Sequence, residues 1–150
     1  MANSGIELSE DVVQKFTDVK SNHKLKYVTY KINFPDKTKI IVDKQLDATD
    51  PVAQDCQSCW EKLTEELEDG EPRYILYDVK NQYKDGRKLE NIVFVSWCSD
   101  NCNIGKKMIH ASSKETLKKK LTGISGTGLH AVDRGDLAYE EVLAEARRGK

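Results

Sequence analysis

The sequence lacks any apolar run long enough to cross a membrane. Its longest uninterrupted apolar stretches, such as residues 92–95, fall far short of the roughly 20 residues that a membrane-spanning helix needs. The N-terminus has neither a basic start nor an apolar segment, and Ala2 excludes N-myristoylation. Together with a mean hydropathy of −0.65, these absences predict a cytoplasmic protein.

The motifs of common enzyme classes are missing as well. The sequence has no Gly-x-x-x-x-Gly-Lys-Ser/Thr loop for nucleotide phosphates and no Gly-x-Ser-x-Gly turn for a nucleophilic serine. His23, His110 and His130 sit in unrelated sequence surroundings, so no pair of nucleophile and base is indicated. We therefore expect a protein that is not an enzyme and needs no cofactor.

Cysteine is scarce, with four residues in 150, and we expect all four to be reduced in a cytosolic chain. Cys56 and Cys59 have a spacing found in redox and zinc sites. They also lie beside Trp60 on the apolar stripe of an expected helix, and no histidine completes a familiar zinc half-site. We interpret both as core residues and expect no metal, with a cysteine-based zinc or redox protein as the alternative from another class.

The net charge of −1 conceals a strong asymmetry. Residues 61–71 carry six acidic side chains against one basic, whereas residues 106–120 carry six lysines against one acid. A basic helical surface suits an acidic protein or an anionic lipid as partner. Because the whole chain is slightly acidic, with a pI near 6.3, we expect no binding to nucleic acid.

Amphipathic periods, caps and turn residues predict four helices and five strands. We expect Ser9 and Asp136 to cap the first and last helices, and Pro51 to open the second. The expected helices cover about 10–20, 51 to Gly70, Asn101 or Asn103 to 121, and 137–148; the expected strands cover 26–32, 39–42, 74–78, 92–97 and 129–132. This order predicts an α+β fold, a mixed sheet of about five strands between helices, as one domain over 1–150.

The lysine-rich third helix is the most informative feature. On a 3.6-residue period, Lys107, Lys114 and Lys118 share one face, while Leu117 and Leu121 turn toward the sheet. Residues 107–124 resemble the long-helix signature of the actin-depolymerising factor/cofilin family. Residues 72–78, the strand ending at Trp97, residues 4–6 and residues 139–143 match in the same order, so the resemblance covers essentially the whole chain.

The resemblance implies the actin-depolymerising homology fold. It also implies a protein that binds actin monomers and filaments, prefers ADP-bound actin, and promotes filament severing and depolymerisation. A coactosin-like protein, which binds along filaments without severing them, is the alternative within the same fold. We expect a monomer at the actin cytoskeleton, and Gly105 stands where many family members carry a basic contact residue.

Residue roles follow from the same resemblance. The resemblance assigns binding to both monomer and filament to Ser4, Gly5, Ile6, Lys106, Lys107, Met108 and Lys114. Binding to filaments alone falls to Arg87, Lys88, Arg147 and Arg148. Phosphatidylinositol bisphosphate would compete with actin at Lys107, Lys118, Lys119 and Lys120. Ser4 matches a serine whose phosphorylation switches family members off, and phosphate would place about −2 of charge where an acidic partner docks.

Overall fold

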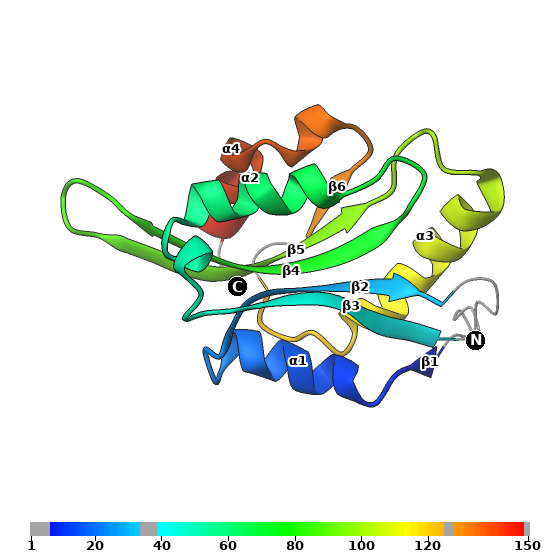
Figure 1. Ribbon diagram of the computed structural model, residues 1–150, viewed down its shortest axis with the longest axis horizontal. Helices are drawn as coiled ribbons and strands as arrows, with labels where there is room; N and C mark the ends of the chain where they lie inside the picture. The colour runs from blue at the N-terminus through cyan, green and yellow to red at the C-terminus, as the bar shows by residue number, and fades with distance from the viewer. Residues whose placement is uncertain (1–6, 34–38, 125–127, 149–150) are drawn as a thin grey trace.

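The computed structural model describes residues 7–33, 39–124 and 128–148. A single sheet forms the middle layer, with α1 and α3 on one face and α2 and α4 on the other (Figure 1). The elements are β1 (Glu7–Leu8), α1 (Asp11–Lys20), β2 (Leu25–Ile32), β3 (Lys39–Asp47), η1 (Pro51–Gln54), α2 (Cys56–Glu66), β4 (Arg73–Gln82), β5 (Lys88–Trp97), α3 (Ile104–Lys118), β6 (Leu129–Ala131), η2 (Arg134–Leu137) and α4 (Tyr139–Arg147).

The described sheet has six strands in the order β1-β3-β2-β4-β5-β6. The four inner strands are antiparallel, whereas the short edge strands β1 and β6 run parallel to β3 and β5. The predicted α+β fold with a mixed sheet between helices is confirmed. The prediction of about five strands missed β1, because a two-residue strand is too short to show an alternating pattern.

Side chains of the central strands alternate between two hydrophobic cores. On β4, Ile75 and Tyr77 face the core under α2 and α4, and Leu76 faces the core under α1 and α3. Trp60 on α2 is fully buried, and its indole N–H donates a 2.7 Å hydrogen bond to the Leu137 carbonyl. Because both faces of the strand are covered, the sequence of β4 is continuously apolar over residues 74–77.

Helix ends follow the expected chemistry in the middle of the chain. The Asp50 carboxylate accepts from the Val52 N–H, with Pro51 at the start of η1. The expected second helix is interrupted at Asp55, whose extended backbone separates η1 from α2 and whose carboxylate caps α2. Asn103 caps α3, as one of the two predicted alternatives, by accepting from the Lys106 N–H.

Two predicted caps were wrong. The Ser9 hydroxyl donates to the Asp11 carboxylate at 2.7 Å instead of accepting from the helix, whose N-cap is Glu10. The Asp136 carboxylate accepts from the Val132 N–H, which lies before it in the chain, and α4 begins later, at Tyr139. Each of the two side chains hydrogen-bonds to another partner within a few residues, and local sequence alone does not show which of the available partners a polar side chain will choose.

The described part of α3 ends at Lys118, three residues before the predicted end. Gly123 follows with φ of +88°, a conformation that favours glycine, and a Cβ at this position would collide with the Lys20 side chain. The Lys20 ammonium donates at 2.8 Å to the Thr122 carbonyl, so α1 fixes the chain just after α3. None of the described helices is long and apolar enough for a membrane span.

Candidate functional site

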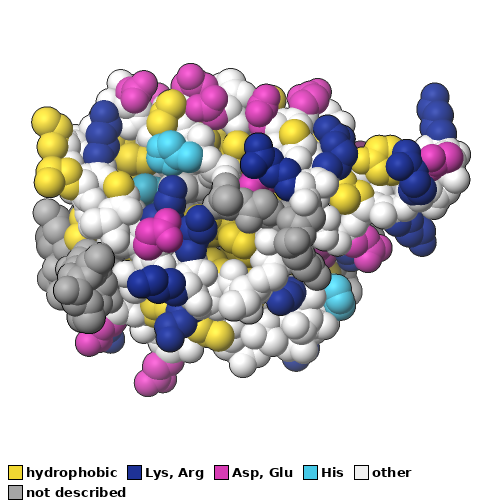
Figure 2. Space-filling model, turned by 180° about the vertical axis from the view of Figure 1, so that it is seen from behind, with side chains coloured by type: hydrophobic (Ala, Val, Ile, Leu, Met, Phe, Trp, Pro, Cys, Tyr) yellow, Lys and Arg dark blue, Asp and Glu magenta, His cyan; other side chains and the backbone are white. Residues whose placement is uncertain are grey.

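The exposed face of α3 begins with two large apolar side chains. Ile104 and Met108 are 75% and 67% exposed, and together with Val13 they are the exposed large hydrophobic residues of the described chain. At a spacing of four residues they are neighbours on the helix, and Ala111 continues the stripe. Figure 2 shows hydrophobic side chains gathered at the edge of the molecule where α3 begins.

The opposite side of α3 fixes the rotation of the helix. His110 is 2% exposed, and its ring stacks on Tyr74 with centroids 4.1 Å apart and planes 7° apart. Its Nε2 lies 2.8 Å from the Ser96 hydroxyl oxygen, and the Tyr74 hydroxyl donates at 2.6 Å to the His110 carbonyl. These contacts join α3 to β4 and β5, so Ile104 and Met108 are held pointing away from the sheet.

His110 is held in its neutral form. Burial lowers the pKa of His110 to about 3, and the positive charges of His130 and Lys114 act in the same direction. Burial likewise lowers the pKa of His130, with Lys114 contributing. The two histidines, unrelated in sequence, thus interact through space, and the hydrogen bond between His110 and Ser96 involves an uncharged imidazole.

Only some of the lysines lie beside the exposed apolar stripe. Lys107 and Lys114 are partly exposed along one flank, and the small residues Gly105 and Ser112 form the other. Lys106 instead falls on the helix side that carries His110, and its ammonium pairs with Glu71 at 3.1 Å. Lys107, Met108 and Lys114 therefore lie together on the outer side of α3, whereas Lys106 lies on the side of the helix that carries His110.

The remaining lysines lie at the far end of α3. Lys118 forms a 3.9 Å ion pair with Glu115, and Lys119 and Lys120 are exposed after the last helical turn. Eleven residues separate Lys107 from Lys118, which is roughly 17 Å along a helix. The four residues predicted to bind phosphoinositide are thus divided between the two ends of the helix.

Arg87 and Lys88 lie on the β4–β5 hairpin, which extends beyond the helices at the end of the molecule opposite α3 (Figure 1). Arg87 is 75% exposed, pairs with Asp85 at 2.7 Å, and lies 5.0 Å from the centroid of the Tyr83 ring. The hairpin arginine is therefore positioned by contacts within its own turn.

The end of α4 lies against the same hairpin. The Asn91 side-chain amide on β5 donates at 2.7 Å to the Ala146 carbonyl. Arg147 and Arg148 follow on the exposed surface, with Arg148 3.4 Å from Glu145. Arg147 and Arg148 thus lie at the end of a helix that packs on the strand bearing Lys88, whereas Ser4, Gly5 and Ile6 lie outside the described residues.

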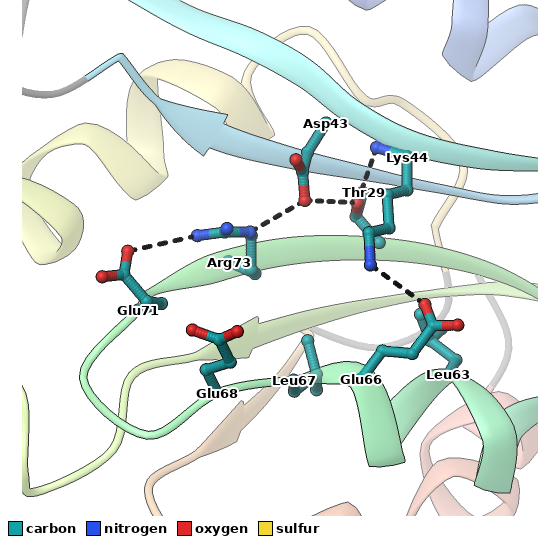
Figure 3. A pocket seen from close by; sticks show the side chains of 9 residues that line it. All are labelled: Thr29, Asp43, Lys44, Leu63, Glu66, Leu67, Glu68, Glu71 and Arg73. Atoms are coloured by element: carbon teal, nitrogen blue, oxygen red, sulfur yellow. Dashed lines mark hydrogen bonds and ion pairs between the residues drawn. The ribbon is translucent and has the colours of Figure 1, made fainter.

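The acidic segment forms one wall of a pocket of about 250 Å³ between α2 and the strands β3 and β4 (Figure 3). Two carboxylates that line the pocket form ion pairs: Glu66 pairs with Lys44 at 3.1 Å, and Asp43 pairs with the Arg73 Nε at 2.9 Å. Glu71 binds Lys106, as above. Basic side chains from other elements therefore offset much of the acidic run seen in the sequence.

Comparison with known proteins decides the family. The model of a family described as cofilin/tropomyosin-type actin-binding protein matches residues 5–147. The chain belongs to the cofilin/ADF family. Among relatives, the cofilin of Gibberella zeae is 35% identical over 99% of this chain and 98% of its own, and the cofilin of Schizosaccharomyces pombe is 33% identical over 99% of both.

Solved structures agree. A cofilin from Streptomyces griseoflavus has a TM-score of 0.79 at 32% identity, covering 97% of this chain and 100% of its own. Actin depolymerization factor 2 from Plasmodium berghei has a TM-score of 0.82 at 28% identity, covering 96% of both chains. The actin-depolymerising homology fold expected from the sequence is confirmed.

Sequence reasoning missed Ile104 as part of the exposed surface. A signal was present, because Ile104 lies four residues before Met108, already assigned to the actin-binding set, and seven before Ala111. An apolar residue in the first turn of a helix is as often buried as exposed, and only the orientation set by His110 distinguishes the two cases.

Proposed function

We propose that this cofilin-family chain binds actin monomers and filaments, prefers ADP-bound actin, and promotes filament severing and depolymerisation. The observation that carries the proposal is the exposed pair Ile104 and Met108, bordered by Lys107 and Lys114. Membership of a family described by actin binding supports it. The protein acts as a monomer in the cytoplasm, and it acts by binding, without making or breaking a covalent bond.

The chemistry of α3 suits an apolar cleft with an acidic rim. Exposed apolar side chains that become buried each contribute about 1.5–3 kcal/mol. Met108 adapts its shape to a cleft because its thioether chain is unbranched. The lysines on the flank add charge complementarity, which mainly raises the association rate and selects the partner. Ser4, Gly5 and Ile6 belong to the same proposed surface.

The two ends of the molecule suggest how filaments are distinguished from monomers. We assign monomer binding to α3 together with Ser4, Gly5 and Ile6. Filament binding uses the same surface together with Arg87, Lys88, Arg147 and Arg148. Because the hairpin and α3 lie at opposite ends, one molecule presents both surfaces at once, as bridging two neighbouring actin subunits requires.

Co-sedimentation with preformed actin filaments tests the proposal. We expect the wild-type protein to pellet with filaments and to move actin into the supernatant. The variant Lys107→Ala/Met108→Ala/Lys114→Ala should lose both effects, whereas the control Lys24→Ala/Lys62→Ala, which removes exposed lysines elsewhere, should retain them. Co-pelleting without release of actin would indicate a coactosin-like side binder, and no association would refute actin binding.

Phosphoinositide binding is proposed for the lysines of α3. Each basic residue near an anionic surface contributes about 1 kcal/mol. Because Lys107 lies far from Lys118, Lys119 and Lys120, we propose that the helix contacts two headgroups. Co-sedimentation with vesicles containing phosphatidylinositol bisphosphate should fall most in a Lys118→Ala/Lys119→Ala/Lys120→Ala variant. Unchanged binding in that variant would contradict the assignment.

Phosphorylation of Ser4 is the proposed regulatory switch. The added charge would repel an acidic partner docking on the same surface. A Ser4→Glu variant should bind actin monomers more weakly than wild type, and Ser4→Ala should bind equally well. Equal binding by both variants would argue against the switch.

A further inference from the structure

Cys56 differs from the other three cysteines in its surroundings. Cys59, Cys98 and Cys102 are buried, with exposed fractions of 1%, 7% and 5%, whereas Cys56 is only partly buried. Cys59 is buried within the core, as interpreted from the sequence, and Cys56 packs against the same core while remaining partly exposed. The first cysteine of the Cys-x-x-Cys motif lies at the border of the core, at the first position of α2.

A buried ammonium group lies against the Cys56 sulfur. Lys26 on β2 is 4% exposed, and its Nζ donates to the Cys56 Sγ at 3.3 Å and to the Asp78 backbone carbonyl. It also lies 5.0 Å from the centroid of the Tyr77 ring. Lysine is seldom buried without a partner of opposite charge, because removing an ammonium from water is costly.

Among the described residues, no carboxylate lies within ion-pairing distance of Lys26. The nearby Asp78 carboxyl pairs with Lys80 at 3.6 Å, and burial raises its pKa, which disfavours its charged form. The Cys56 sulfur touches the ammonium directly. Lys26 also acts through space on the Asp78 carboxyl and favours its charged form, so the Cys56 sulfur and this carboxyl are two groups beside Lys26 that can carry negative charge.

Two further features stabilise negative charge on this sulfur. The backbone N–H of Lys80 donates to it at 3.4 Å. Cys56 also opens a helix of 11 residues, whose N-terminal end carries partial positive charge. Thiolates next to lysine and at helix N-termini are the form in which cysteine reacts as a nucleophile.

The sulfur is also accessible. A pocket of about 320 Å³ is lined by Cys56, by polar residues of η1 and α2, by Lys80 and Asn81 of β4, and by Tyr139 of α4. None of the other three thiols combines partial exposure with a contacting ammonium group. Burial raises the pKa of the Cys59 thiol, and it raises that of the Cys98 thiol to about 12, so both remain protonated at neutral pH.

We propose that Cys56 is a selective modification site, where the thiolate reacts with small disulfides of the glutathione class. The sulfur attacks one sulfur of the disulfide, a new S–S bond forms at Cys56, and the old S–S bond breaks. The leaving glutathione thiolate takes a proton from water. The product is a mixed disulfide at the N-terminus of α2, and Lys26 is the positioning residue.

The test is incubation of the full chain with glutathione disulfide at neutral pH, followed by mass measurement of the intact protein and of its peptides. We expect one adduct per molecule, on Cys56, before any on the other three cysteines. A Cys56→Ser variant should remain unmodified over the same time. First modification at Cys59, Cys98 or Cys102 would overturn the proposal, and this ranking within the wild-type protein requires no variant to fold.

The role of Lys26 is tested by rate. In Lys26→Met, loss of the ammonium that contacts the sulfur should slow the reaction by only about threefold, because the intrinsic nucleophilicity of a sulfur rises as negative charge on it becomes less stabilised. Lys31→Met, on the same strand but partly exposed and paired with Asp43, is the control and should react at the wild-type rate. Thermal unfolding verifies that both variants fold, and an unchanged rate in folded Lys26→Met would refute the role of the ammonium.

Discussion

The two ends of the molecule carry proposed binding surfaces of opposite construction. On α3, exposed apolar side chains stand on a helix that a buried histidine, Tyr74 and Ser96 hold in place. On the β4–β5 hairpin, exposed charges are held by neighbours in the same turn, such as Asp85 with Arg87. The first surface gains binding energy from burial, and the second gains it from charge that salt screens. Substitutions at the two ends should therefore differ in size and in salt dependence.

The largest effect is expected on α3 itself. Replacing both apolar side chains, as Ile104→Ser/Met108→Ser, should weaken binding to actin monomers by about 3 kcal/mol, or roughly a hundredfold, because two buried anchors are lost. The stability of the free protein should change by less than about 0.5 kcal/mol, because both residues are exposed. Fluorescence titration of monomers and chemical unfolding measure the two quantities. A loss under threefold would contradict the assigned anchors.

The folded protein should lose stability in acid, because His110 is buried beneath α3 in its neutral form. The pKa of His110 is about 3 in the folded protein and near 6.5 when unfolded, so the unfolded state takes up the proton first. Its contribution to stability is therefore complete above about pH 6.5 and is lost as the pH falls toward 3. By pH 5 the free energy of unfolding should have decreased by about 2 kcal/mol.

Chemical unfolding between pH 7 and pH 5 measures this loss against a His110→Gln variant, which cannot gain charge. The wild type should lose about 2 kcal/mol more than the variant over that interval. Parallel pH profiles for the two proteins would show that His110 is not the responsible group.

A smaller effect is expected at the hairpin. Arg87→Ala/Lys88→Ala should weaken filament binding by about 1 kcal/mol at low salt and less at high salt, since exposed charges contribute little once screened. Monomer binding should not change. Co-sedimentation at two salt concentrations, with monomer titration alongside, measures both. An equal loss for monomers and filaments would remove the distinction between the two ends.

The smallest effect separates two adjacent lysines. Lys106 is paired with Glu71 on the sheet side of α3, whereas Lys107 lies on the flank of the apolar stripe. Lys106→Ala should weaken actin binding by less than about 0.5 kcal/mol, and Lys107→Ala by more. Monomer titration of the two single variants ranks them, and the reverse order would place Lys106 in the contact.

Much of the fold followed from local patterns. Near-continuous apolar runs located the two central strands, and the period of 3.6 residues located the buried Leu117 and Leu121 of α3. The spacing of Lys106, His110, Ser113 and Leu117, at intervals of four and three, already placed Lys106 on the buried side, although its charge suggested a surface role. In this case helical geometry was the better guide than residue type.

Contacts between distant segments could not be predicted in the same way. Lys106 meets Glu71 across 35 residues, and Lys26 meets Cys56 across 30. No local pattern encodes such pairs, because they depend on how strands and helices are placed in three dimensions. The orientation of Ile104 and the exposure of Cys56 both depend on contacts of this kind.

The short edge strands bear on how this protein behaves at high concentration. A long, exposed edge strand offers unpaired backbone groups to another molecule and promotes aggregation. Within the described residues, β1 pairs with only the first two residues of β3, and β6 with only the last three of β5. The rest of β3 carries Asp43, Lys44 and Asp47, at two register irregularities opposite β2. A chain whose task would be to take polymers apart thus has a sheet that is poorly suited to polymerising with itself.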